Sequence, residues 1–126
     1  MRAINTKNEK LIGCKIAVAS WFWTKMVGLL NRKNLHVGEG LLIKNCNNIH
    51  SIGMKFNFDA VYLDKKNTVV HFEEDIPSGR ICKPVLKAAH VLELPSGTVK
   101  LTDIEIGNEI KFEDIVIERA LDRSNT

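Results

Sequence analysis

The sequence predicts one α+β domain that is mainly β, with a small sheet closed, or left partly open, in a barrel-like form and one short amphipathic helix. Three observations predict this class. The chain has 126 residues, the length of a single domain. Several short segments are rich in β-prone residues and are bounded by turn residues. A single segment spaces its apolar residues as a helix does. Short strands with one helix in so short a chain favour a compact sheet that closes on itself.

The first half of the chain supplies four of the expected strands. Residues 11–17 and 40–43 are short and apolar, and each fits one strand. Residues 58–63 are almost continuously apolar apart from Asp59, so we expect burial on both faces of the sheet. Residues 64–67 are typical of a turn, and residues 68–73 are expected to return as the hairpin partner.

The expected helix covers residues 21–30, with the Ser20 hydroxyl able to cap its start. Its apolar stripe is formed by Phe22, Met26, Leu29 and Leu30. Trp21 and Trp23 fall on opposite sides of the helix start, so both cannot face the core. The outward one is either a contact for a sugar ring or a partner protein, or a half-buried side chain against a loop.

The second half of the chain predicts two more strands. Residues 85–94 read as one long strand between turns at 77–79 and 95–97. Residues 106–109 form a tight turn into residues 110–113, which alternate apolar and polar side chains with the period of a strand.

The domain is expected to span residues 11–118, with an N-terminal segment at 1–10 and a polar tail at 119–126. Lys and Arg exceed Asp and Glu by 18 to 15, and both signs are spread along the chain. This balance argues against a nucleic-acid partner, which needs a clustered basic face. No apolar run approaches the roughly 20 residues that span a bilayer, so we expect no membrane insertion. The first ten residues lack the apolar core of a signal peptide, which predicts a cytoplasmic protein.

The three cysteines, Cys14, Cys46 and Cys82, are far apart and odd in number. We expect three reduced and mostly buried thiols rather than a disulfide framework. A metal site would have to combine Cys46 and Cys82 with His50 and His90, and their spacing matches no zinc motif. The sequence therefore predicts no cofactor and no stoichiometric zinc.

Residues 46–59, Cys-Asn-Asn-Ile-His-Ser-Ile-Gly-Met-Lys-Phe-Asn-Phe-Asp, resemble the central motif of the bacterial and archaeal family called domain of unknown function 192. The segments at 25–30, 40–43, 91–97 and 106–109 resemble its other motifs in order, although Lys25 stands where the family has Arg and Leu30 where it has Met. The resemblance runs from about Leu11 to Phe112. It implies a single β-rich domain with a short helix, and the family has no assigned reaction.

Several residues of these motifs have side chains that could act in catalysis or bind a ligand. Cys46 and His50 lie four apart, and an imidazole can activate a thiolate, but a buried thiol beside a hydrogen-bonded histidine is the favoured interpretation. Asp59 and Glu93 lie within apolar strands and could converge as an acid–base pair. They could equally accept backbone hydrogen bonds, and for Asp59 we expect donors from the loop at 50–54. Met54 either packs in the core or lines a ligand groove.

The sequence favours a small non-enzymatic binding module whose site is built from residues 46–59 and the turn at 93–97, because binding groups are commonly displayed on such loops. The expected ligand-binding residues are His50, Met54, Asp59 and Glu93. The partner is a small molecule, a saccharide or a protein, and the chain is expected to be a monomer or weak dimer. Two alternatives stay open. One is a hydrolase or lyase using Asp59 and Glu93 with His50, and the other is an accessory subunit of a larger assembly.

Overall fold

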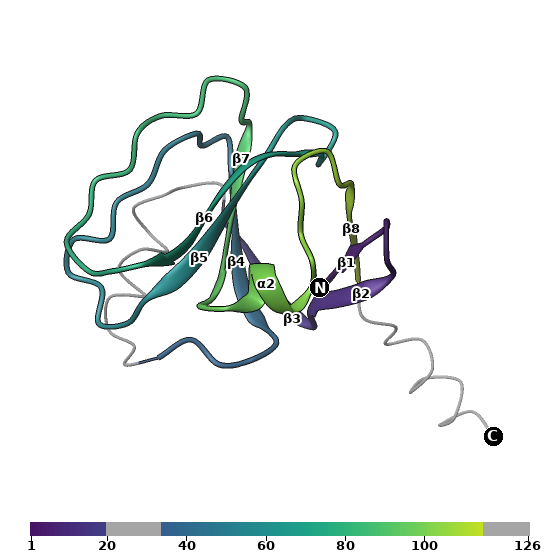
Figure 1. Cartoon of the computed structure of the whole chain (residues 1–126), viewed down its shortest axis with the longest axis horizontal. Helices are drawn as coiled ribbons and strands as arrows, with labels where there is room; N and C mark the ends of the chain where they lie inside the picture. The colour runs from purple at the N-terminus through teal and green to yellow at the C-terminus, as the bar shows by residue number, and fades with distance from the viewer. Residues whose placement is uncertain (20–33, 115–126) are drawn as a thin grey trace.

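The computed structural model of the chain describes residues 1–19 and 34–114 (Figure 1). The expected helix at 21–30, with Trp21 and Trp23, and the expected tail at 119–126 lie outside these residues. No helix within the two described ranges is long and apolar enough to cross a membrane.

The described residues are mainly β, as the sequence predicts, and they include one short helix that the sequence analysis did not expect and that is not the helix expected at 21–30. The elements are β1 (Arg2–Asn5), β2 (Lys10–Gly13), β3 (Lys15–Ala19), β4 (Glu39–Lys44), β5 (Phe58–Leu63), β6 (Val69–Ile76), β7 (His90–Pro95), α2 (Thr98–Leu101) and β8 (Ile110–Glu113).

These strands form two sheets. One has the order β2-β1-β8 and the other the order β3-β4-β7-β5-β6, with β7 and β5 near its centre. Only the β3–β4 pair is parallel in the larger sheet, and the other neighbours are antiparallel. In the smaller sheet, the N-terminal strands meet the strand at 110–113 because β1 pairs with both β2 and β8. Two sheets, rather than one closed ring of strands, are thus what the described residues show, and a barrel-like closure is not confirmed.

The strand expected at 11–17 is two strands in two different sheets. β2 ends at Gly13 and β3 begins at Lys15, and the amides of Cys14 and Lys15 both donate to the Gly38 carbonyl, at 2.9 and 2.8 Å. A Cβ on Gly13 would lie 3.0 Å from that same carbonyl oxygen, so the crossing between the sheets needs a glycine here. Residues 1–10 also belong to the fold, since they contribute β1 and the buried Ala3.

The strand expected at 85–94 begins only at His90. Residues 85–89 turn instead, with the Ala88 amide donating to the Val85 carbonyl at 2.9 Å. Val85 and Ala88 pack against the core from this turn. An apolar segment can be buried as a covering loop as well as within a strand, and periodicity does not separate the two.

The central strand at 58–63 is confirmed as β5, with all six side chains buried. It pairs with β6 as the expected hairpin and with β7 on its other side. Successive side chains of a strand point to opposite faces, so β5 and β7 serve two separate apolar clusters. One face carries Ala60, Tyr62 and Val91, and the other carries Val61, Leu92 and Leu94.

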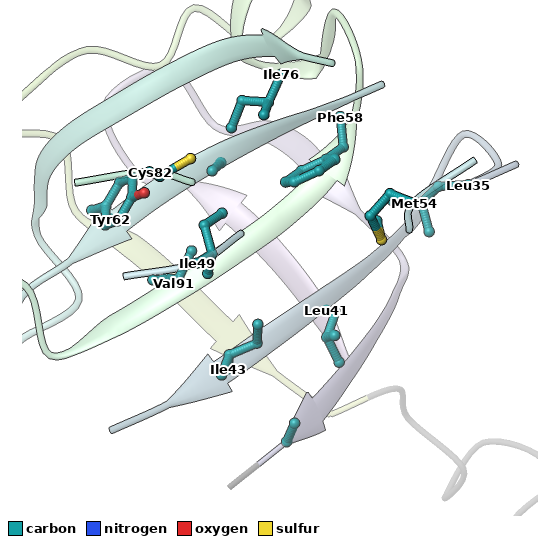
Figure 2. Close-up of a cluster of buried hydrophobic side chains, with 12 residues drawn as sticks. Leu35, Leu41, Ile43, Ile49, Met54, Phe58, Tyr62, Ile76, Cys82 and Val91 are labelled. Carbon is teal, nitrogen blue, oxygen red and sulfur yellow. The ribbon is translucent and has the colours of Figure 1, made fainter. Parts of the chain in front are cut away.

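The first face lies beneath two long loops, residues 45–57 and 77–89, which we call the cover. Figure 2 shows Cys82 of the cover beside Tyr62 of the sheet, Ile49 beside Val91, and Met54 beside Leu35, and all of them belong to one apolar cluster. The opposite face packs against the smaller sheet and α2, through residues that include Ala3, Ile12, Val99 and Ile110. The larger sheet is therefore the middle layer of the described residues.

The two loops of the cover are joined to each other by backbone hydrogen bonds and run side by side (Figure 1). The bonds are Cys46 N to Ala89 O at 2.9 Å, Val85 N to Asn47 O at 2.9 Å, Cys82 N to Ile49 O at 3.0 Å, Ser51 N to Arg80 O at 2.8 Å and Gly79 N to Ser51 O at 3.1 Å. The Ser51 hydroxyl adds to them by donating to Pro77 O at 2.6 Å and accepting from Arg80 N at 2.9 Å. A loop pair tied in this way can satisfy its own backbone while its apolar side chains face the sheet.

Candidate functional site

The cover and the adjoining end of the larger sheet enclose a groove of about 770 Å³. We call it the 44–52 groove after the segment that supplies most of its wall. Its lining residues are Lys44, Asn45, Cys46, Asn47, Asn48, Ile49, His50, Ile52, Lys65, Ile81, Ala88 and Ala89.

The lining of the 44–52 groove combines apolar side chains with two lysines. Isoleucine and alanine side chains contribute the apolar surface, and Ile52 and Ile81 remain 51% and 75% exposed. Lys44 and Lys65 contribute two ammonium groups, and no Asp or Glu is among the lining residues. Apolar walls with a few convergent polar groups are typical of small-molecule sites.

Cys46 and His50 both line the 44–52 groove, so the structure brings this expected pair to one site. The Cys46 thiol is half-buried and donates a hydrogen bond to the Asn48 carbonyl at 2.9 Å. Burial raises the pKa of Cys46. An activated nucleophile needs a lowered thiol pKa, so the geometry favours the structural interpretation of Cys46.

The surroundings of Asp59 indicate a structural role. Its carboxylate is fully buried and accepts hydrogen bonds from three backbone amides. Oδ1 accepts from Asp75 N at 2.8 Å, and Oδ2 accepts from Gly97 N at 3.1 Å and Val99 N at 2.9 Å. The expectation that the donors come from the loop at 50–54 is wrong. The donors come from the end of β6 and the start of α2, because β5 and β7 hold the turn after Pro95 beside the beginning of β5.

Glu93 is the most unusual ionisable residue of the described chain. Glu93 is 1% exposed and lies in β7, between Leu41 of β4 and Ala60 of β5. Neither carboxyl oxygen has a hydrogen-bond partner among the described residues. Burial raises the pKa of Glu93 to about 8, so the side chain is mostly a neutral acid at pH 7. Because an ionised carboxylate without partners is very costly in an apolar interior, a bound proton is the cheaper state.

The structure does not bring Asp59 and Glu93 together. Glu93 lies opposite Ala60, whereas Asp59 lies opposite Leu94, so the two side chains leave the sheet on opposite faces. The carboxylate that shares a face with Glu93 is Glu73 of β6, on the other side of Ala60. The spacing between alternate strands separates these two by roughly 10 Å at Cβ.

Met54 and the turn at 93–97 also lie away from the 44–52 groove. Met54 is buried in the core under the cover, as its packing interpretation predicts. The groove adjoins the beginning of β7 through Ala88 and Ala89, and the turn follows the end of β7. Of the four expected ligand-binding residues, His50 alone therefore lines the groove.

A polar group around Glu73 was not expected from the sequence. Glu73 lies 3.6 Å from Arg80 and 3.8 Å from His71, and these residues line a second hollow of about 560 Å³. Burial and Glu73 raise the pKa of the neighbouring Cys82 thiol, and burial raises that of Tyr62. The polar residues within the run from 69 to 76 were the available signal, since a fully buried strand rarely carries them.

Across residues 1–19 and 34–114, no three His, Cys, Asp or Glu side chains form a group that could hold a metal ion. All three cysteines are free thiols. The expectation that they are mostly buried is wrong in part, because Cys82 is buried and Cys46 half-buried, but Cys14 is exposed where the chain crosses between the sheets.

Comparisons with known proteins agree with this fold. A UPF0127 protein of Thermococcus sibiricus is 25% identical over 114 residues, which are 87% of this chain and 73% of that protein. A crystal structure from Sinorhizobium meliloti 1021, described as a "putative transcription regulator", matches with a TM-score of 0.71 at 20% identity over 87% of this chain and 89% of that one. A protein of unknown function from Novosphingobium aromaticivorans matches with a TM-score of 0.73 at 14% identity over 88% and 82%.

The family model of DUF192, described as "Uncharacterized ACR", matches residues 3–112, which is most of the chain and includes both loops of the cover. The resemblance noted at residues 46–59 is thereby confirmed, and this chain belongs to the DUF192 family.

Proposed function

We propose that this protein is a non-enzymatic binding module that holds a small molecule in the 44–52 groove. The observation that carries the proposal is the groove itself, about 770 Å³ in volume and lined by apolar side chains together with polar and basic ones. Sites for small organic ligands commonly have volumes of roughly 300–1,000 Å³ and this kind of lining.

The hydrogen bonds within the cover support a preformed site. Asn47 and Ile49, two residues of the groove wall, accept from Val85 and Cys82 of the other loop at 2.9 and 3.0 Å. Ile49 is also anchored in the core. A wall held in this way loses little conformational freedom when a ligand binds, which favours affinity.

The arrangement of the acidic residues supports binding over acid–base catalysis. Three backbone amides occupy the Asp59 carboxylate, and Glu93 faces the opposite side of the sheet from Asp59. A hydrolase of the paired-carboxylate kind needs both groups at one substrate. Asp59 and Glu93 therefore do not form the acid–base pair that such a hydrolase needs.

The proposal is tested by titrating ¹⁵N-labelled protein with a library of small organic molecules and following the backbone amide resonances. We expect at least one compound to shift resonances at 44–52, 81 and 88–89 in a saturable manner. A full library without any saturable shift in these segments would overturn the proposal.

A matched pair of variants locates the binding. Ile52 lines the 44–52 groove but not the second hollow, and Leu86 lines neither, yet both are exposed apolar residues of the cover, at 51% and 90%. Ile52→Glu is expected to weaken binding of an apolar compound at least several-fold, because it places a charge on the apolar lining of the groove. Leu86→Glu introduces the same charge outside the groove and is expected to leave the affinity unchanged. Equal effects of the two variants would place the binding elsewhere.

Three narrower sequence predictions accompany the proposal: a cytoplasmic location, a monomeric or weakly dimeric state, and a partly open barrel-like arrangement of the strands. Sedimentation at several protein concentrations tests the oligomeric state. A constant monomer mass over a 100-fold range of protein concentration would show that the chain does not form a weak dimer in that range.

A further inference from the structure

We propose that the ligand of the 44–52 groove is an amphipathic organic anion, a molecule with one carboxylate or phosphate group and an apolar body. This inference rests on the proposed binding function and adds the chemical class of the ligand. Two features of the groove carry it: two lysines in a lining that contains no Asp or Glu, and exposed aliphatic side chains in the same lining.

The two lysines of the groove lining come from different elements. Lys44 ends β4, and Lys65 lies in the turn between β5 and β6. Within the two described ranges, neither ammonium group has a carboxylate within salt-bridge distance, whereas Lys10 pairs with Asp103 and Lys111 with Glu113. Asp64 precedes Lys65 in the turn but is not a lining residue, and it accepts from the amides of Lys66 and Thr68. The lining itself therefore carries a net positive charge, which attracts anions.

His90 lies beside the groove, with Lys44 and Asp64 both close enough to influence it. The His90 Nδ1 accepts a hydrogen bond from the Asn45 amide at 3.2 Å, so this nitrogen carries no proton in that arrangement. Burial lowers the pKa of His90 and the positive charge of Lys44 lowers it further, whereas the Asp64 carboxylate acts in the opposite direction. The net effect is a lowered pKa, which favours the neutral imidazole.

Two asparagines of the groove lining offer further hydrogen-bond donors. The backbone amides of Asn47 and Asn48, both groove residues, donate to no acceptor among the described residues. The side-chain amides of these two asparagines likewise have no hydrogen-bond partner among the described residues. Backbone amides together with lysine side chains are common partners of carboxylate and phosphate oxygens.

The second hollow provides a contrast within the same molecule. There, Glu73 is itself a lining residue and lies within 4 Å of Arg80 and His71, which leaves Lys83 as the basic residue of that lining without an ion pair among the described residues. The 44–52 groove has basic groups without such a partner and has the larger volume. This difference is the reason for assigning an anion to the groove rather than to the hollow.

The test compares ligands that share one eight-carbon chain and differ in charge: octanoate, octyl phosphate, octanol and octylammonium, with acetate as an anion that lacks the chain. Affinities are measured by amide chemical shifts at 44–52. We expect octanoate or octyl phosphate to bind at least 10-fold more tightly than octanol, and octylammonium and acetate to bind most weakly. The affinities of octanoate and octyl phosphate, compared with each other, identify whether the groove prefers a carboxylate or a phosphate.

Three lysine variants examine the role of charge. Lys44→Gln and Lys65→Gln are each expected to weaken the anion by about 2- to 5-fold, as for a partly exposed ion pair, and to leave octanol unaffected. Lys100→Gln removes the same charge from α2, beyond the far end of β7, and is the control. Raising the salt concentration is expected to reduce anion binding to the parent and to reduce it less in the double variant.

The outcomes separate this inference from the proposed function. Tight binding of octanol or octylammonium at the groove, insensitive to the lysine variants, would overturn the anionic class while the binding function stands. Absence of groove binding by the whole library would overturn the proposed function. Equal losses in Lys100→Gln and Lys65→Gln would mean that net charge, rather than the groove, attracts the anion, and would also overturn the inference.

Discussion

Asp59 and Glu93 stand on neighbouring strands one residue out of register, so their carboxyl groups leave the sheet on opposite faces. Asp59 faces the smaller sheet and α2, where three backbone amides surround it. Glu93 faces the apolar cluster beneath the cover, where neither oxygen has a hydrogen-bond partner among the described residues. The same residue class in the same sheet therefore has opposite properties, and the predictions for the two residues differ accordingly.

Asp59→Asn is expected to lower the free energy of unfolding by about 1–3 kcal/mol. The amide keeps the shape of the side chain but replaces one acceptor oxygen with an NH₂ group that faces the amide of Asp75, or those of Gly97 and Val99. Urea unfolding followed by circular dichroism measures the change. The control is Asp103→Asn, at an exposed residue with φ of 51°, a conformation that asparagine also tolerates. A melting temperature of Asp59→Asn at or above that of the parent would contradict the structural role.

Glu93 makes the stability of the protein decrease as the pH rises. The pKa of Glu93 is about 8 in the folded chain and close to 4.5 when unfolded, so between these values only the folded chain keeps the proton. The stabilising proton is fully present below about pH 4.5 and is lost as the pH rises through 8. The free energy of unfolding is expected to fall by about 1.4 kcal/mol per pH unit within this window from Glu93 alone.

The variant Glu93→Gln cannot ionise and isolates this contribution from those of other groups. Its stability relative to the parent is expected to improve steadily from pH 5 to pH 8, measured by urea unfolding at each pH. Glu93→Met is expected to be at least as stable as the parent at pH 7, because an apolar side chain suits the position between Leu41 and Ala60. Parallel pH profiles for parent and Glu93→Gln would show that Glu93 does not hold a proton in the folded chain.

Ser51→Ala is expected to loosen the cover. The buried hydroxyl joins the two loops by donating to Pro77 O and accepting from Arg80 N, and its removal leaves both backbone groups without that partner. The expected loss is about 1–3 kcal/mol. Hydrogen exchange at the amides of Cys82 and Val85, which donate across the cover, should become faster.

Ser96→Ala is the comparison for Ser51→Ala, since it removes a hydroxyl whose bond to Asp75 lies at an exposed position. Its effect is expected to stay within about 0.5 kcal/mol. Unchanged exchange at Cys82 and Val85 in Ser51→Ala would mean that the loops are held together without the hydroxyl.

The three thiols are expected to react with a disulfide reagent in the order Cys14, Cys46, Cys82 at pH 7. Cys14 is exposed, whereas burial raises the pKa of both Cys46 and Cys82 and shields their sulfur atoms. Absorbance of the released thiolate gives the three rates, and Cys14→Ser should remove the fast phase alone. A fast phase that survives in Cys14→Ser and disappears in Cys46→Ser would instead support an activated Cys46–His50 pair.

The sequence by itself determined the class of the fold and its central strand. Apart from Asp59, the side chains at 58–63 are apolar or aromatic on both faces of the strand, so burial on both faces followed from the sequence, and the turn residues at 64–67 dictated the hairpin. The motif at 46–59 also identified the family, because fixed spacing of unlike residues is specific in a way that periodicity is not.

Only the tertiary structure decided which side chains meet. A shift of one residue in the β5–β7 register would have placed Asp59 and Glu93 on one face, and nothing local to either strand encodes that register. The pairing of the loops at 45–57 and 77–89 likewise depends on hydrogen bonds between residues 28 to 43 positions apart in the sequence, which no short window along the chain contains. The groove exists because those loops meet, so Lys65 and Ile81 could be assigned to one site only after the chain had folded.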